Sequence, residues 1–254
     1  MFHRISFGLS IHMILLIKTT LTYISWIIIF IIFTIILFPL ALLPAKIRHN
    51  RLFFFISWLW NKLLVLSSFI NIKIDGKNNL PKYPNSPSII IANHSSALDI
   101  FLIESILSSY PRTWLCKDSY AKIPIFGTIA KRMHVPVKRE NPKQAIRALF
   151  KVCEIAKLGP KHIILFPEGT RHSDGKIHTF LPGFAILAKK LNYPVIPIAI
   201  KGVNKIFPKK SLLVDSKAKT AKLIVGKPFF YNNQKTQKEF IEKVENWFKD
   251  MVED

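Results

Sequence analysis

The spacing of hydrophobic residues along this chain changes near residue 70. Residues 19–45 contain no charged side chain, and their centre reads WIIIFIIFTIILF, with no polar face. As a helix, the stretch from Leu21 to Leu43 would reach ~34 Å, about the thickness of a hydrocarbon core. A buried helix of a soluble protein would show an amphipathic face, and a cleaved signal peptide would be shorter. The stretch therefore predicts a membrane helix, and Pro39 leaves a spanning and a re-entrant course open.

A second apolar segment, residues 51–69, follows with only two charged side chains. It predicts either an interfacial helix, with Trp58 and Trp60 at the depth of the lipid headgroups, or a core helix of the next domain. We therefore expect membrane-embedded or interfacial helices over residues 1–69 and one α/β domain over residues 70–254.

Beyond residue 70, short apolar runs alternate with helical patterns. Residues 88–92 (SIIIA) are continuously apolar, as in a strand buried on both faces. Asn141 and Pro142 are typical of a helix start, and Gly159 of the end of the same helix. Strands are expected at 70–74, 88–92, 113–117, 134–138, 162–166, 195–200 and 221–225, and helices at 97–109, 124–133, 142–158, 183–191 and 235–251. This alternation predicts an α/β fold with a mixed, largely parallel sheet flanked by helices.

The chain is strongly basic, with a formal net charge of +22. Such a charge indicates a polyanionic partner, which could be nucleic acid, an acidic substrate or an anionic lipid surface. A nucleic-acid binder would interleave aromatic and basic residues, whereas the aromatic residues here concentrate in the apolar N-terminal part, so membrane lipid is the expected partner. Lys46, Arg48 and Arg51, set against Arg4 and Lys18, predict an integral membrane protein with its main domain on the cytoplasmic face.

The sequence IANHSSALD, residues 91–99, places His94 and Asp99 at the exit of the strand expected at 88–92. Within one helix the two side chains would point about 140° apart. They meet only if His94 precedes the helix and Asp99 lies in its first turn, with Ser96 as the N-cap. These residues alone leave two interpretations open: a histidine oriented by an acid, or a capping box in which Asp99 only accepts from main-chain amides.

A second polar segment, FPEGTR, residues 166–171, follows another buried strand. Arg171 offers a bidentate fork to a phosphate, and Gly169 lets the main chain approach it. Glu168 and Thr170 add a carboxylate and a hydroxyl. On its own the segment fits either a phosphate-facing loop or an ordinary polar turn.

The two cysteines, Cys116 and Cys153, have no CxxC spacing, so neither a zinc site nor a disulfide framework is expected.

Together these segments resemble the glycerolipid acyltransferases, the PlsC-like family typified by 1-acylglycerol-3-phosphate acyltransferase. NHSSALD matches the NHxxxxD signature of that family, and FPEGTR matches its other diagnostic motif. Residues 116–140 resemble the block between the two motifs. Residues 193–202 (YPVIPIAIKG) resemble the fourth block, with Pro197 as its central proline. The resemblance covers residues 70 to about 230, and the apolar N-terminus also fits the family.

The resemblance implies transfer of an acyl chain from acyl-CoA or acyl carrier protein to a lysophospholipid hydroxyl. An acyl thioester is already activated, so no metal and no cofactor is expected. His94 would act as general base, and Asp99 would hold its tautomer and stabilise the imidazolium. Main-chain amides near Ser96 would stabilise the oxyanion. Ser95 and Ser96 lie outside a GxSxG elbow, so neither is expected to form an acyl-enzyme.

The expected acceptor is 1-acylglycerol-3-phosphate, and the product is phosphatidic acid. The residues expected to bind it are Lys117, Arg139, Glu168, Gly169, Thr170 and Arg171. Relatives often carry a lysine shortly after the second motif, where this chain has Leu181. Another lysolipid or an aminolipid precursor therefore stays open as the acceptor, and so does a non-enzymatic lipid-binding protein of the same fold.

Overall fold

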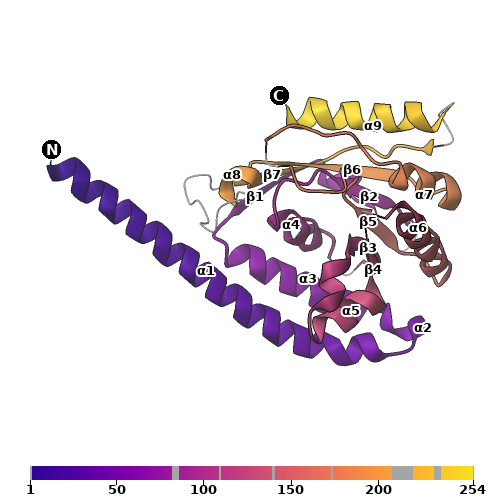
Figure 1. Ribbon diagram of the computed structural model, residues 1–254, viewed down its shortest axis with the longest axis horizontal. Helices are drawn as coiled ribbons and strands as arrows, with labels where there is room; N and C mark the ends of the chain where they lie inside the picture. The colour runs from indigo at the N-terminus through magenta and orange to yellow at the C-terminus, as the bar shows by residue number, and fades with distance from the viewer. Residues whose placement is uncertain are drawn as a thin grey trace.

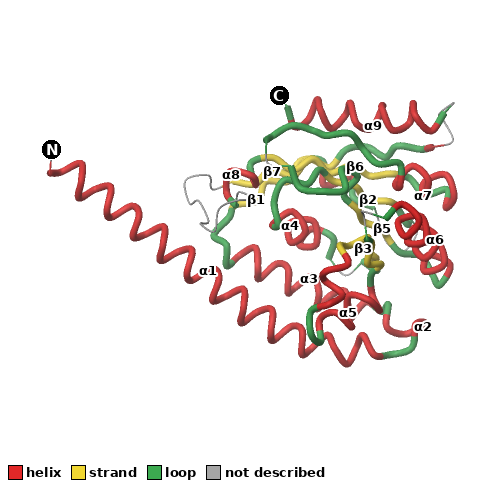
Figure 2. Tube along the Cα trace, in the orientation of Figure 1, coloured by secondary structure: helices red, strands yellow, loops and turns green. Residues whose placement is uncertain are grey.

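The protein is an α/β structure built on one sheet (Figures 1 and 2). A computed structural model describes residues 2–81, 86–108, 110–138, 141–172, 174–207, 220–231 and 236–253, with side chains from Met13 onward. Within these residues the strands are β1 (Asn71–Asp75), β2 (Ile89–Ala92), β3 (Arg112–Lys117), β4 (Val135–Val137), β5 (His162–Leu165), β6 (Val195–Lys201) and β7 (Thr220–Val225). The helices are α1 (Phe2–Leu42), α2 (Ala45–Arg48), α3 (Arg51–Leu66), α4 (Leu98–Ile106), α5 (Phe126–Met133), α6 (Pro142–Lys157), α7 (Gly183–Leu191), α8 (Val203–Ile206) and α9 (Gln237–Val252).

In the described residues the seven strands run in the order β1-β7-β6-β2-β5-β3-β4. Each neighbouring pair is parallel except β6 and β7, which are antiparallel. The predicted mixed, largely parallel sheet is therefore confirmed, and each expected strand lies within one residue of its observed bounds. The expected bounds were accurate because strands buried on both faces leave uninterrupted apolar runs in the sequence.

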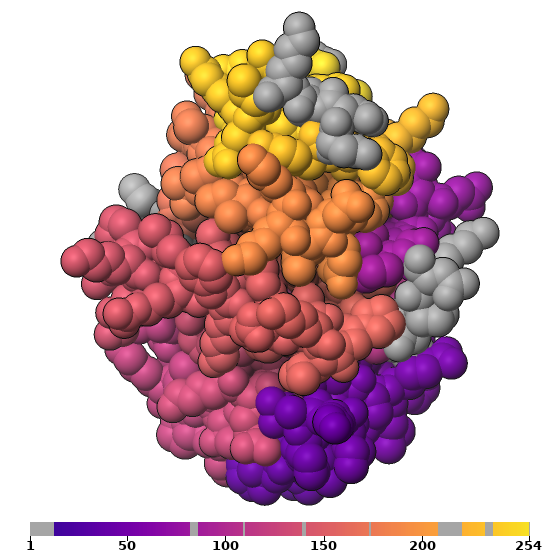
Figure 3. Space-filling model, turned by 90° about the vertical axis from the view of Figure 1, so that its right-hand side faces the viewer, coloured from indigo at the N-terminus to yellow at the C-terminus, as the bar shows by residue number. Residues whose placement is uncertain are grey.

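Two hydrophobic cores lie on the two faces of the sheet. Successive side chains of a strand point to opposite faces, so Ile90 packs with the α3, α4 and α8 side of the sheet. Ile89 and Ile91 pack instead with α6, α7 and α9. Each of these three isoleucines is fully buried. Seen from the side, the N-terminal helices lie at one end of the molecule and α9 at the other, with the sheet region between them (Figure 3).

Two helices begin with a side-chain cap, of which the one at Asn141 was predicted, and the predicted start of a third helix is wrong. The Asn141 side chain accepts from the Gln144 amide at the start of α6, and Thr236 forms a complete capping box with Glu239 at the start of α9. The helix predicted from Pro124 begins instead at Phe126. Ile125 has a φ angle of +61°, which a right-handed helix cannot contain, so the helix starts after it.

The apolar N-terminus forms the long helix α1, which continues through Pro39 in its last turn. Its segment from Met13 to Leu42 is long and apolar enough to cross a membrane. Helix α3 packs against α1 and α4, and the Trp60 ring stacks on Phe33 at a centroid distance of 6.1 Å. Helix α3 thus contributes one face to the core, while Phe55, Leu59 and Leu66 stay exposed, so the interfacial location of residues 51–69 stays a prediction.

Candidate active site

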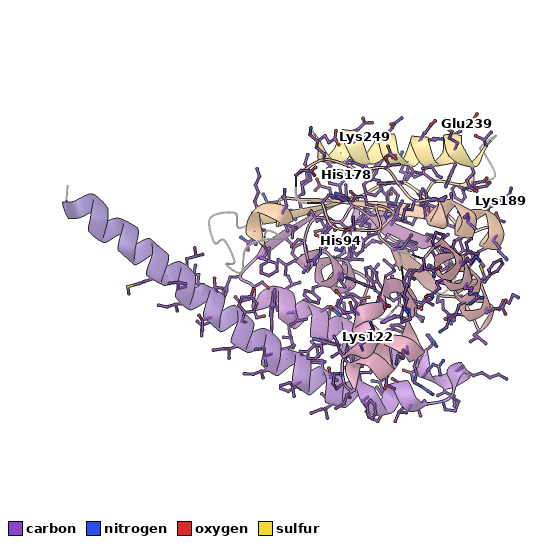
Figure 4. All side chains as sticks on the ribbon, in the orientation of Figure 1. His94, Lys122, His178, Lys189, Glu239 and Lys249 are labelled. Atoms are coloured by element: carbon purple, nitrogen blue, oxygen red, sulfur yellow. The ribbon has the colours of Figure 1, made fainter. Side chains whose placement is uncertain are left out.

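His94 and Glu168 lie at the carboxyl ends of two adjacent parallel strands. His94 follows β2, and Glu168 follows β5, which pairs directly with β2. The exit of β2 is fixed by Asn93, whose side-chain amide donates to the Ile200 carbonyl at 3.0 Å and accepts from the Ile200 amide at 2.7 Å. This edge of an open α/β sheet is where ligands gather. Figure 4 shows His94 near the middle of the molecule, with Lys189 and Lys249 towards its edge.

The predicted contact between His94 and Asp99 is present. His94 Nδ1 lies 2.9 Å from Asp99 Oδ2, and the carboxylate is fully buried. The imidazole also stacks on the Phe166 ring, with centroids 3.8 Å apart and an interplanar angle of 6°. The ring is therefore held by its edge and by its face, with Nδ1 turned towards Asp99.

Helix α4 begins one residue later than expected, at Leu98, so its N-cap position is Ala97, which gives no side-chain cap. The Ser96 hydroxyl still accepts from the Leu98 amide at 3.4 Å, and it donates to the Phe207 carbonyl at 2.9 Å. Asp99 Oδ2 accepts from the main-chain amides of Ser95 and Ser96, at 2.7 and 2.8 Å. A single carboxylate oxygen of Asp99 thus accepts from both amides and also contacts the imidazole, so the contacts expected from each of the two interpretations are present.

The same hydrogen bonds correct the expected oxyanion site. The amides of Ser95 and Ser96 point at Asp99 and already have a charged acceptor. An oxyanion would have to displace a buried carboxylate to reach them. These two amides are therefore excluded as oxyanion donors.

The main chain of His94 is held by the loop that contains FPEGTR. Glu168 Oε1 accepts from the His94 amide at 2.8 Å, and the His172 amide donates to the His94 carbonyl at 2.8 Å. Glu168 Oε2 accepts from the His178 amide at 3.3 Å, so the carboxylate joins three segments of the chain. Glu168 was predicted to belong to the acceptor-binding residues. In the described residues its hydrogen bonds fix the backbone that carries the imidazole.

Comparison with known proteins assigns the chain to a family whose match includes both sequence motifs. The family model described as Acyltransferase matches residues 71–201, which is more than half of the chain and contains both motifs. The chain belongs to this acyltransferase family. The family resemblance inferred from the sequence is thereby confirmed.

Similar proteins of known name and structure agree with this assignment. A chloroplastic 1-acyl-sn-glycerol-3-phosphate acyltransferase from Brassica napus, BAT2, is 35% identical over 63% of this chain and 46% of its own length. The Arabidopsis thaliana protein LPAT1, of the same description, is 34% identical over 70% and 49%. This acyltransferase thus spans about half the length of these relatives. The crystal structure of the 1-acyl-sn-glycerophosphate (LPA) acyltransferase PlsC from Thermotoga maritima has a TM-score of 0.78 at 26% identity, covering 95% of this chain and 96% of that one.

The other predicted site residues of the acyltransferase lie at or near the same sheet edge. Lys117 is exposed at the end of β3, Thr170 is exposed, and Arg171 is half-buried. Gly169 has a φ angle of +72°, and a Cβ built on it would lie 2.7 Å from Leu181 Cδ1, so the turn requires glycine. Arg139 lies outside the described residues.

Two histidines of this loop were not predicted. The His172 and His178 rings stack with centroids 3.6 Å apart, and His178 Nε2 lies 2.8 Å from Asp174 Oδ2. His172 directly follows the FPEGTR motif, which was the only available signal in the sequence. The loop is also tied to α9, because Glu253 accepts from the Ile177 amide at 2.7 Å and Glu245 from the Phe180 amide at 3.1 Å.

Burial raises the pKa of the Glu168 carboxyl to about 7, and the amides of His94 and His178 oppose this shift only in part. The Glu168 carboxyl of the folded protein therefore keeps its proton at pH values where the same carboxyl in the unfolded chain has lost it. The contribution of Glu168 to stability is largest below about pH 4.5 and falls as the pH rises towards about 7. Between these limits, wild type should lose up to about 3 kcal/mol relative to Glu168→Gln.

Thermal unfolding of wild type and Glu168→Gln in detergent, at about pH 5 and about pH 8, measures this difference. Buried neutral histidines such as His134 shift stability in the opposite direction in both proteins, so the comparison isolates Glu168. An identical pH dependence of the two melting temperatures would contradict the prediction.

Proposed function

We propose that this acyltransferase moves an acyl chain from an acyl thioester to the free hydroxyl of 1-acylglycerol-3-phosphate, forming phosphatidic acid. The observation that carries the proposal is the His94–Asp99 pair, an imidazole whose Nδ1 lies 2.9 Å from a buried carboxylate. The names of the two plant relatives and of the Thermotoga maritima enzyme support the acceptor.

In the proposed reaction His94 Nε2 takes the proton of the acceptor hydroxyl while that oxygen attacks the thioester carbonyl. The new C–O bond forms, the C–S bond breaks, and the imidazolium returns the proton to the departing thiolate. General base catalysis of this kind contributes roughly 10²–10⁴-fold. Asp99 keeps the Nδ1 proton in place and offsets the positive charge that develops on the ring.

The acceptor phosphate is assigned to the basic residues around the FPEGTR loop. Arg171 is the main described candidate, because a guanidinium binds phosphate in a bidentate manner. Lys117 and Arg139 are the further candidates, and Gly169 and Thr170 complete the loop.

The donor is acyl-CoA or acyl carrier protein, and both are anionic partners suited to a chain of net charge +22.

The acyltransferase is proposed to act at a membrane surface, held there by α1. The apolar segment Met13–Leu42 supports membrane association. The basic residues Lys46 and Arg48 follow this segment, which favours an orientation with the α/β domain on the cytoplasmic face. A lysolipid acceptor would then reach the site from the bilayer.

Purified protein in detergent, supplied with acyl-CoA or acyl carrier protein donors and a panel of lysolipids, tests the proposal. We expect the highest kcat/KM with lysophosphatidate. Preference for another lysolipid or an aminolipid precursor would overturn the acceptor assignment. Lipid binding without acylation of any acceptor would favour the non-enzymatic alternative.

The Arg171→Ala variant should bind the acceptor poorly. A hydrogen bond to a charged group contributes about 1.5–3 kcal/mol, so the KM for lysophosphatidate should rise by about 10–100-fold with little change in kcat. Monoacylglycerol lacks the phosphate, so any activity with it should change little. Lys238→Ala is the matched control, since Lys238 is an exposed cation on α9, outside this loop. Equal effects of the two substitutions would contradict the assignment.

A further inference from the structure

A group of basic side chains lies at the sheet edge opposite the candidate active site. Lys161 directly precedes β5 and is only 2% exposed. Strands β3 and β5 are parallel, and Arg112 pairs in register with His162, so Lys161 lies beside the start of β3. His94 and Glu168 follow the other ends of β2 and β5. The two sets of residues are therefore separated by the length of the strands.

Helix α2 brings two more basic residues to this edge. Arg48 ends α2, and His49 follows it, immediately after the apolar helix α1 (Figure 1). The centroids of the His49 and Phe54 rings lie 6.2 Å apart, and the Arg112 guanidinium carbon lies 5.2 Å from the Phe54 centroid. Phe54 thus joins α2 to the start of β3. Arg48 and Lys161 are close enough for their charges to interact.

The basic side chains of this group lack the hydrogen-bond partners that buried polar groups normally have. Arg112 is paired with Glu104, its Nε lying 2.9 Å from each carboxylate oxygen. In contrast, Arg48 Nε and both ring nitrogens of His49 are buried without a hydrogen-bond partner in the described part of the chain. Lys161 likewise has no hydrogen bond or ion pair with a described residue. Lysine is almost never fully buried unless it is paired.

The electrostatic environment of the group is positive. Burial, followed by the nearby Arg48, lowers the pKa of Lys161 to about 8. Burial lowers the pKa of His49 to about 3, and Lys161, Arg48 and His134 add to the effect. Arg132 stands next to Arg48 and donates to the carbonyls of Ala41, Leu42 and Leu43 at the end of α1. An anion among these groups would convert mutual repulsion into attraction.

We infer that Lys161, Arg48 and His49 form a binding site for a phosphate-type anion, separate from the candidate active site. A guanidinium fork and an ammonium are the side chains that bind phosphate most strongly, and neutral His49 adds one N–H donor. Arg48 and His49 are partly exposed, which leaves a path for the anion. The site lies where the apolar part of α1 ends, so either a phospholipid headgroup or free phosphate can supply the ligand.

Thermal unfolding of the full chain tests this site without reference to activity. Wild type in detergent is titrated with inorganic phosphate, and is separately placed in nanodiscs of phosphatidylcholine with or without phosphatidylglycerol. At a phosphate concentration tenfold above its dissociation constant, we expect the melting temperature to rise by about 3–6 °C. Lys161→Met and Arg48→Gln should abolish the rise. In anion-free buffer Lys161→Met should be at least as stable as wild type, because it removes an unpaired buried charge.

Matched controls replace exposed lysines on neighbouring elements. Lys46→Gln changes the same charge on α2, and Lys157→Met introduces the same side chain on α6; both should keep the full response. Stabilisation by phosphate that the site variants lose identifies a free-anion site. Stabilisation only by phosphatidylglycerol nanodiscs, again lost in the variants, identifies a lipid-headgroup site. No stabilisation in either setting, or an equal response of wild type and site variants, would overturn the inference and leave the proposed acyl transfer untouched.

Discussion

Replacing His94 with alanine should lower kcat for acyl transfer by about 10²–10⁴-fold, the contribution typical of a general base. The imidazole is the group that would accept the hydroxyl proton, and its Nδ1 is engaged by Asp99 at 2.9 Å. Alanine keeps the main-chain amide that donates to Glu168 at 2.8 Å, so the loop should remain in place. Initial rates with lysophosphatidate and an acyl thioester measure the effect, and KM for the acceptor should change little.

The Ser95→Ala variant is the matched control for His94→Ala. Ser95 contributes its main-chain amide to Asp99, and alanine retains that amide. Activity should therefore stay within a few-fold of wild type. An inactive Ser95→Ala variant beside an active His94→Ala variant would reverse the assignment, because it would indicate an acyl-serine intermediate.

The strands could be predicted from sequence because burial on both faces produces unbroken apolar runs. Residues 162–166 (HIILF) predicted β5 within one residue of its observed end, Leu165. Helices α6 and α9 were predicted well because their start signals are local hydrogen bonds of Asn141 and Thr236. The four-residue helices α2 and α8 were missed, since so short a segment shows no helical period.

The candidate site was predictable only where its contacts are local. His94 and Asp99 are five residues apart, so the direction of the chain at a strand exit was enough to predict that they meet. Glu168 and the His94 amide are 74 residues apart, and Asn93 and Ile200 are 107 apart. Such pairs depend on the strand order of the sheet, which the sequence pattern does not determine. The buried position of Lys161 beside Arg48 was missed for the same reason.

The Asp99→Asn variant should lower kcat by about 10²–10⁴-fold, the range that the histidine itself supplies. Asp99 Oδ2 accepts hydrogen bonds from Nδ1 of His94 and from the amides of Ser95 and Ser96. Its other oxygen, Oδ1, is buried and has no hydrogen-bond partner among the described residues. If the asparagine oxygen keeps the first position, its NH₂ is buried without a partner, and the negative charge beside the developing imidazolium is lost. If the amide turns over, its NH₂ faces main-chain donors and opposes the required tautomer of His94.

Asp174→Asn is the control for the loss of an acid that contacts a histidine. Asp174 Oδ2 lies 2.8 Å from His178 Nε2, but this pair is exposed and lies away from Nδ1 of His94. Its kcat should therefore stay within a few-fold of wild type, in the same assay with saturating donor and acceptor. Wild-type kcat in Asp99→Asn, together with an inactive His94→Ala variant, would show that Asp99 serves only the amides of Ser95 and Ser96. A loss of kcat in Asp99→Asn at unchanged KM would show instead that the buried negative charge acts on the imidazole, because the asparagine oxygen can still accept from both amides.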